Sequence, residues 1–285
     1  MRYCGREFSQ NDIEKIRTII KESPEKHRTH ISRIVCETFN WYKPDGKLKE
    51  MSCRVALLRM ERDGLLVLPP PRTKNSNGKI TVQKTSQSDP QPINCLPAGK
   101  ITGLRIVPVT TRQESGLWNE YIDRYHYLGY KPLPGAQLRY MVYSENNVLA
   151  LLGFGASAWK VSPRDNYIGW SHEQRKKNLQ LIVNNARFLI LPWVRSKNLA
   201  SRILSIITKR LPSDWQQRYG YKPVLLETFV EQGRFHGTCY KAANWVYVGL
   251  TQGRGKMDSK NEYKLPKKYI YIYPLSKTFR KTLFA

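Results

Sequence analysis

The sequence predicts a mixed α/β, or α+β, fold in two parts: a helical domain of the winged-helix kind, then a larger domain built around a central sheet. Two observations support this prediction. The first 72 residues contain three apolar runs at helical spacing and then a short extended stretch that ends in three prolines. Beyond residue 100, short apolar runs typical of strands alternate with segments of helical content. We therefore expect domains at 1–72 and 101–256, a linker at 73–100 and a basic extension at 257–285.

The expected N-terminal domain has recognisable helix boundaries. Ser9 and Asp12 precede the isoleucines of the first run as a cap, and Gly64 follows the third run as a stop. Three short helices and an extended tail outline a winged helix-turn-helix, in which the third helix reads DNA. That helix would present Arg54, Arg59 and Arg62. A helical docking module with solvated basic residues is the alternative, because residues 1–72 carry 15 basic and 10 acidic side chains, which is only a modest basic excess.

Residues 73–100 are rich in Ser, Thr, Asn, Gln, Pro and Gly, which predicts a linker or an ordered wrap with a short strand at KITVQ. The strands expected after it are LRIVPV, QLRYMVYS, VLALLGFGAS, ARFLILPWV and PVLLETFV. The helical segments expected between them are WNEYIDRYHYLGY, HEQRKKNLQLIVNN, NLASRILSIITKRL and RFHGTCYKAANW. The basic extension should contain one short strand, at YIYIYPL.

Charge is the strongest compositional signal. The chain has 48 basic and 22 acidic residues, a net charge of +26, which favours polyanions and predicts DNA, single-stranded DNA included, or another nucleic acid as the partner. No apolar run approaches the roughly 20 residues of a membrane span, and the polar start MRYCGREFSQ does not resemble a signal peptide. Five cysteines without CxxC spacing argue against a zinc ribbon or a disulfide framework and indicate a cytoplasmic protein.

Three titratable residues are candidates for catalysis from their residue type and setting. His126, in YHY, is a natural general base. Asp165 follows Arg164, itself a candidate for binding nucleic acid, in a loop near Trp170, where Asp165 could orient His126, contact a base edge, or form a buried pair with Arg164. Glu227 lies on an expected inner strand, where a carboxylate is usually paired or functional.

Two basic segments are candidates for binding phosphate. The first lies between a strand and a helix and offers an anion cradle; it consists of Arg195, Ser196, Lys197 and Asn198. The second is GLTQGRGK, in which Arg254 and Lys256 supply charge between glycines, while Trp245 nearby suits stacking on unpaired bases. No His, Cys and carboxylate cluster has metal-ligand spacing, but a metal-dependent nuclease built from dispersed acidic residues stays open as an alternative.

The segment Arg195–Ala200 resembles the pyrophosphate-binding turn of GNAT-type acyltransferases, and the helix with Tyr240 followed by NWVYVG resembles the end of the same fold. This resemblance implies a GNAT-like fold, acyl-coenzyme A as a cofactor, and Tyr240 as the donor of a proton to the leaving thiolate. Two departures are visible. Asn198 stands where that family usually has glycine, and ARFLILPWV has no carboxylate to serve as a base.

Residues 101–256 contain the motifs YHYLGY, SPRDNYIGWSHEQRKKNL and NNARFLILPWVRSKNLAS. Over this range the chain is similar to the DruA-like family, named for Druantia anti-phage systems and also found on mobile elements beside transposase-like domains. This resemblance implies a role in defence or mobile-element biology. Together with the basic charge, it leads to the hypothesis of a nucleic-acid-binding protein of such a system that modifies or processes DNA. A transposase-like or metal-dependent strand-processing enzyme, and a non-catalytic recognition module, are the alternatives. The cofactor stays open between acyl-coenzyme A and a divalent metal.

Overall fold

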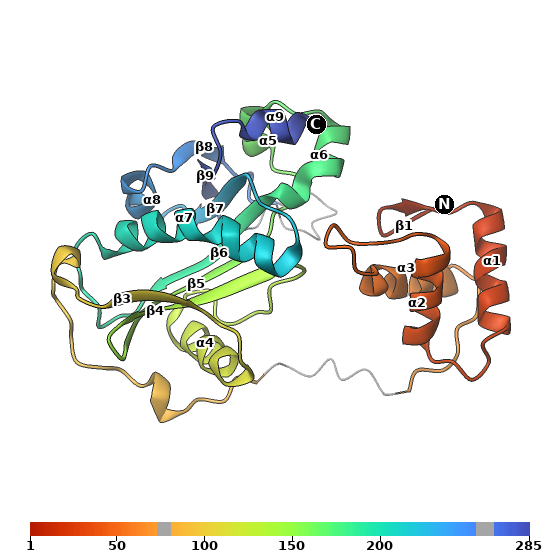
Figure 1. The fold of residues 1–285 in the computed structure, drawn as a ribbon, viewed down its shortest axis with the longest axis horizontal. Helices are drawn as coiled ribbons and strands as arrows, with labels where there is room; N and C mark the ends of the chain where they lie inside the picture. Colours follow the sequence, from red (N-terminus) through yellow and green to blue (C-terminus); the bar gives the residue numbers. More distant parts are fainter. Residues whose placement is uncertain (73–80, 255–264) are drawn as a thin grey trace. The chain divides into compact units, whose positions relative to one another are not determined.

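The computed structural model describes residues 1–72, 81–254 and 265–285. The chain divides into two compact units, Met1–Ile80 and Thr81–Ala285 (Figure 1). Each unit has its own hydrophobic core and is described by itself.

Over residues 1–72, the described part of the first unit, the chain forms a short hairpin and three helices. Their bounds are β1 (Arg2–Tyr3), β2 (Arg6–Glu7), α1 (Gln10–Lys21), α2 (Arg28–Thr38) and α3 (Glu50–Arg62). The predicted cap is confirmed: the Ser9 hydroxyl accepts the Asp12 amide, and the Asp12 carboxylate accepts the Ser9 amide. The expected extended stretch after α3 forms no strand over residues 65–72, and the hairpin precedes α1 instead. The winged-helix interpretation therefore stays a prediction.

The second unit is built on one mixed sheet. In the described residues its strands are β3 (Leu104–Pro108), β4 (Gln137–Ser144), β5 (Asn147–Ala156), β6 (Ile182–Ile190), β7 (Leu225–Glu231), β8 (Val246–Leu250) and β9 (Lys268–Pro274). Their order across the sheet is β3-β4-β5-β6-β7-β9-β8, and every neighbouring pair is antiparallel except β6 and β7. The predicted α+β fold with a central sheet is confirmed.

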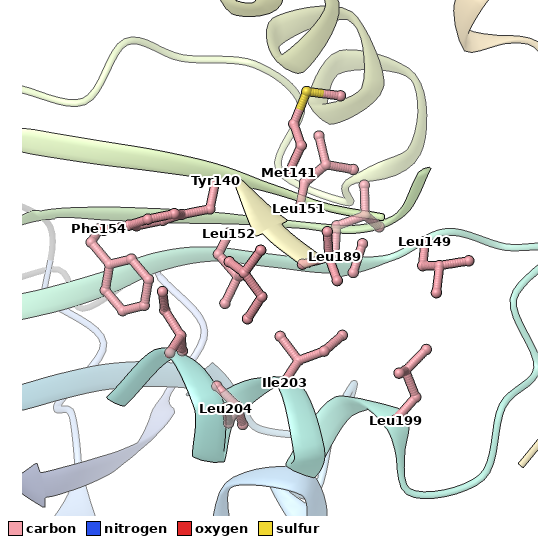
Figure 2. Close-up of a cluster of buried hydrophobic side chains, with 14 of the residues drawn as sticks. Tyr140, Met141, Leu149, Leu151, Leu152, Phe154, Leu189, Leu199, Ile203 and Leu204 are labelled. Carbon is pink, nitrogen blue, oxygen red and sulfur yellow. The ribbon is translucent and has the colours of Figure 1, made fainter. Parts of the chain in front are cut away.

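Helices cover both faces of this sheet (Figure 1). Their bounds are α4 (Arg112–Tyr125), α5 (Ser162–Ile168), α6 (His172–Asn178), α7 (Leu199–Tyr219), α8 (Thr238–Ala242) and α9 (Phe279–Phe284). Figure 2 shows Ile203 and Leu204 of α7 facing the sheet from one side, while Met141 points away from α7 on the other side. On the α4 side, a methyl group added to Gly153 would lie 3.1 Å from the Trp118 ring, so the absence of a side chain lets α4 approach closely.

Two parts of the sequence prediction are wrong. Residues 257–285 were expected as an extension, but β9 lies inside the sheet between β7 and β8, and α9 packs beside α6. Helical content was expected through 172–185, but α6 ends at Asn178 and Ile182 begins β6. The β-branched pair Ile182 and Val183 favours the strand and is buried in the core.

Residues 81–101 belong to the second unit as an ordered wrap. The carboxylate of Glu120, which is only 3% exposed, accepts hydrogen bonds from the Thr85 amide and the Ser88 hydroxyl. Further along, Asn94 forms a parallel bridge with Val194 ahead of α7. The predicted strand at KITVQ lies partly outside the described residues, and residues 81–83 form no strand. Within the described parts of the chain, no helix has the length and apolar character needed to span a membrane.

Candidate functional site

A cavity of about 550 Å³ lies where β6 and β7 separate. The two strands pair only from Ile182 to Asn185 and from Leu225 to Thr228. Beyond that pairing, both strands line the cavity, together with the end of α4 and the loop that leads into α8. His126 and Tyr240, two of the predicted catalytic residues, both line it.

Tyr240 is held at the wall of this cavity by hydrogen bonds. Its hydroxyl donates to the side-chain oxygen of Asn185 at 2.7 Å and lies 3.4 Å from the Thr228 hydroxyl. Burial raises the pKa of Tyr240, so the phenol keeps its proton. Because that single proton is already donated to Asn185, this arrangement does not offer it to a leaving thiolate.

Asn185 links Tyr240 to an irregularity in β6. Its amide nitrogen donates to the Arg187 carbonyl at 3.1 Å, and the β5–β6 register shifts between Gly153 and Phe154, so that Ala186 has no partner in the ladder. A bulge of this kind re-aims the side chains next to it. Tyr240 and Asn185 therefore support the segment that carries Arg187 along the cavity.

His126 caps the C-terminal end of α4 and is neutral. Burial, and secondly the charge of Arg187, lower its pKa to about 4. Its Nδ1 accepts the Leu128 amide at 3.2 Å, which leaves the hydrogen of the neutral ring on Nε2. In this tautomer the ring offers a ligand a hydrogen-bond donor, whereas the predicted role was that of a general base.

The side chains that line the cavity are either positively charged or uncharged. Among the described residues that line the cavity, the positively charged ones are Arg187 and Lys268, and none carries a carboxylate. Arg187 is half-buried and desolvation lowers its pKa, but a guanidinium stays charged. One of its Nη atoms donates to the Ala186 carbonyl at 2.7 Å, while Nε is buried and has no partner within the described residues.

The other two predicted catalytic residues lie in a separate ionic cluster. Arg164 is fully buried and binds Glu227 at 2.8 Å and Asp165 at 2.7 Å. Arg175 also contacts Asp165, at 3.2 Å, and the Trp170 ring donates to the same carboxylate. Burial raises the pKa of Glu227, and Arg164 acts in the opposite direction. Asp165 thus forms the buried pair with Arg164 that the sequence left open, and it makes no bond to His126.

The predicted phosphate-binding residues differ in accessibility. Arg195, Lys197 and Asn198 are exposed before α7, whereas Ser196 is half-buried. Arg164 is 0% exposed and Trp245 is 4% exposed, packed against Tyr240 and Tyr273, so the expectation that they contact nucleic acid directly is wrong. Arg254 is exposed, and Lys256 lies outside the described residues.

In the N-terminal unit, Arg59 and Arg62 are exposed on α3 and Arg54 is half-buried. The buried residues of the same helix are Cys53, Ala56, Leu57 and Met60.

The segment before α7 fits coenzyme A poorly. The Arg195 amide already donates to the Asn94 carbonyl at 2.8 Å, and the Lys197 carbonyl accepts the Ala98 amide. Asn198 adopts the left-handed conformation, with φ of 64°, at the start of the helix. The wrap thus takes up the Arg195 N–H, one of the backbone donors that a pyrophosphate cradle would need.

The residues that were candidates for a divalent metal site also fit a metal poorly. The carboxylates of Asp165 and Glu227 are occupied by arginines, and the described residues contain no group of three His, Cys, Asp or Glu able to hold an ion. Fold and cavity together define a basic α+β protein with a pocket suited to an anionic ligand.

The chain belongs to the DruA family: the family model described as "Druantia protein DruA" matches residues 59–263. Comparison with the curated proteins finds no match.

Among solved structures the chain is similar to acetyltransferases. A GNAT-family acetyltransferase from Streptococcus pneumoniae is 11% identical with a TM-score of 0.39, over 61% of this chain and 99% of that one. A polyamine N-acetyltransferase from Drosophila melanogaster is 11% identical with a TM-score of 0.38, over 60% and 100%. The ribosomal-protein-S18-alanine N-acetyltransferase from Escherichia coli is 10% identical with a TM-score of 0.37, over 61% and 94%. These similarities say nothing of the substrate or reaction of this chain.

Sequence reasoning missed Arg187, Asn185 and Phe235 of this cavity. Arg187 is the only charged residue in the stretch ARFLILPWV, and a charge in an apolar strand is a usable signal. Asn185 and Phe235 gave no such signal, because their role depends on where β6 and β7 separate.

Proposed function

We propose that the protein binds DNA in a Druantia-type anti-phage defence system and engages the nucleic acid at the cavity between β6 and β7. The observation that carries this proposal is the net charge of +26. A charge of this size attracts the phosphate backbone and supports binding that salt weakens. Membership of the DruA family supports the defence context.

The exposed side of α3 supports a role in reading DNA. Arg54, Arg59 and Arg62 form no salt bridge with any described residue of the chain. Between them, Met51, Val55 and Leu58 are 62%, 36% and 43% exposed. Arginine can bind phosphate or the guanine edge, and apolar side chains can contact the thymine methyl group in the major groove.

The contacts in the second unit favour recognition over strand cleavage. Asp165 and Glu227 are each bound to arginine, and the Tyr240 proton is donated to Asn185. Binding is therefore the first part of the proposal. Modification or processing of the DNA is the second part and would take place on a ligand held in the cavity.

The test is fluorescence anisotropy of labelled single- and double-stranded DNA against the full chain at 50 and 200 mM salt. We expect affinity to fall by roughly a thousandfold over this range if about six phosphates are neutralised. Replacing Arg54, Arg59 and Arg62 with Gln should weaken binding by at least about tenfold. The matched control removes the same charge from exposed Lys15, Lys21 and Lys26 of the same unit and should weaken it less. An affinity independent of salt, or no binding at 50 mM salt, would refute the proposal.

A further inference from the structure

We infer that the cavity binds one nucleotide, with its phosphate on the Arg187 guanidinium and its base against the exposed ring of Phe235. This inference rests on the proposed function, because it names what the site takes. Four features of the cavity support it, namely the charge of Arg187, the donors and acceptors beside it, the aromatic mouth and the volume.

The first feature is an uncompensated charge. Arg187 is half-buried, makes no salt bridge within the described residues, and faces a cavity whose described lining holds no carboxylate. A charge that is partly removed from water and has no ionic partner is costly, and its cost falls when an anion enters. The planar guanidinium fork matches the oxygen atoms of a phosphate or carboxylate.

Neighbouring polar groups complete the anion site. His126 presents an Nε2 hydrogen, and Lys268 adds a second cation to the cavity wall. The side-chain oxygen of Asn184, also in the wall, is buried and has no partner among the described residues. It can accept a hydrogen bond from a hydroxyl or amino group of a ligand. A ligand with both an anion and such donors satisfies all of these groups, and a nucleotide has both.

The mouth of the cavity is aromatic. Phe235 is 45% exposed in the loop before α8, and the Tyr127 ring meets it edge-on at 5.3 Å. Tyr127 is itself fixed, because His126 stacks on it at 4.8 Å and the Arg234 guanidinium lies 4.9 Å from its centre. Phe235 is therefore braced and still open to a ligand. Stacking on such a ring is how many proteins hold an unpaired base.

The volume of the cavity is also suitable for a nucleotide. The cavity of about 550 Å³ falls in the range of about 300–1,000 Å³ typical of small-molecule sites. Stacking accepts every base, because each base has a flat π-face, so we expect little preference among the four. The same phosphate chemistry comes from a free nucleotide or from the phosphorylated end of a strand.

The test is isothermal calorimetry of the full chain with a nucleoside monophosphate, the matching nucleoside, inorganic phosphate, and short oligonucleotides with a 5′-phosphate or a 5′-hydroxyl. The monophosphate should bind at least about tenfold more tightly than the nucleoside or phosphate alone. Arg187→Gln and Phe235→Ala should each weaken it by about tenfold or more, and Arg187→Lys less than Arg187→Gln. The exposed Arg218→Gln on α7 is the matched charge control and should bind as the parent does.

Two comparisons make the outcome decisive. Tighter binding of the 5′-phosphorylated oligonucleotide identifies a strand end as the source of the phosphate, and binding of the monophosphate alone identifies a free nucleotide. Equal binding of nucleoside and monophosphate, or an Arg187→Gln variant that binds as the parent does, overturns the inference. Salt-sensitive DNA binding by a protein that does not bind the monophosphate overturns the inference but leaves DNA binding, the first part of the proposed function, intact, so the two failures are distinguishable.

Discussion

The cluster of Glu227, Arg164 and Asp165 yields the sharpest prediction about stability. Glu227 and Arg164 are both 0% exposed and bind at 2.8 Å, and the other Glu227 oxygen accepts the Ala158 amide at 2.9 Å. Replacing Glu227 with Gln keeps the shape and one acceptor but leaves the Arg164 charge without this partner. Removing one partner of a buried pair costs about 3–5 kcal/mol. Since Arg164 keeps Asp165, we expect about 3 kcal/mol for Glu227→Gln.

The assay is urea denaturation followed by tryptophan fluorescence, which reports on the second unit because six of the seven tryptophans lie there. Arg164→Met and the double variant complete a double-mutant cycle, in which the double variant should lose about 1–3 kcal/mol less than the sum of the single ones. Glu173→Gln, a change at a carboxylate that is 77% exposed, is the control and should stay within about 0.5 kcal/mol of the parent. A Glu227→Gln protein as stable as the parent that has lost activity on DNA would refute a structural role and indicate a catalytic carboxylate.

Three further predictions follow from the cavity. Tyr240→Phe should cost about 1–3 kcal/mol in urea denaturation, because Asn185 loses its donor, and should leave DNA binding unchanged; loss of binding without loss of stability would contradict this. The free energy of unfolding should fall by about 2 kcal/mol as pH drops from about 6.5 to 4, because the pKa of His126 is about 4 in the folded chain and about 6.5 in the unfolded chain, which therefore binds the proton first. In thermal melts, His126→Gln should flatten this pH dependence. An unchanged pH dependence would refute the lowered pKa of His126. Gly237→Ala should lower the free energy of unfolding by more than about 2 kcal/mol, because φ is +67° and the new methyl group would lie 2.5 Å from the Tyr271 ring. Gly233→Ala, where φ is +85° and no atom lies within 4 Å of the new methyl group, should lower it by about 1 kcal/mol. Equal losses in the two variants would contradict the steric reason.

Much of the fold could be predicted from local patterns. The bounds of β4 agree with the predicted strand QLRYMVYS. The Ser9 cap, and the change from helical runs to strand-like apolar runs near residue 100, are likewise local features of the sequence. The place of β9 could not be predicted, because YIYIYPL identifies a strand but not its neighbours. Pairing between β9 and β7 is a long-range choice, settled by packing of the whole sheet.

The candidate site was only partly predictable. His126 and Tyr240 were identified by residue type and by a family resemblance, and both line the cavity. Trp245 and Arg164 were assigned to nucleic acid because their charge or ring suited it, but burial, which a sequence does not state, places them inside the protein. Arg187 escaped notice because its significance is the lack of a partner, and partners are known only once the chain is folded.

The most direct measurement of the central claim is the rate at which Cys239 reacts with a small thiol reagent. Cys239 lines the cavity, half-buried, whereas Cys95 is exposed elsewhere and serves as an internal control. Burial raises the pKa of Cys239 to about 11, so labelling is followed by peptide mass spectrometry near pH 8.5. A saturating nucleoside monophosphate should slow labelling of Cys239 but not of Cys95, and this protection should vanish in Arg187→Gln. Labelling of Cys239 at the same rate with and without the nucleotide would contradict the account.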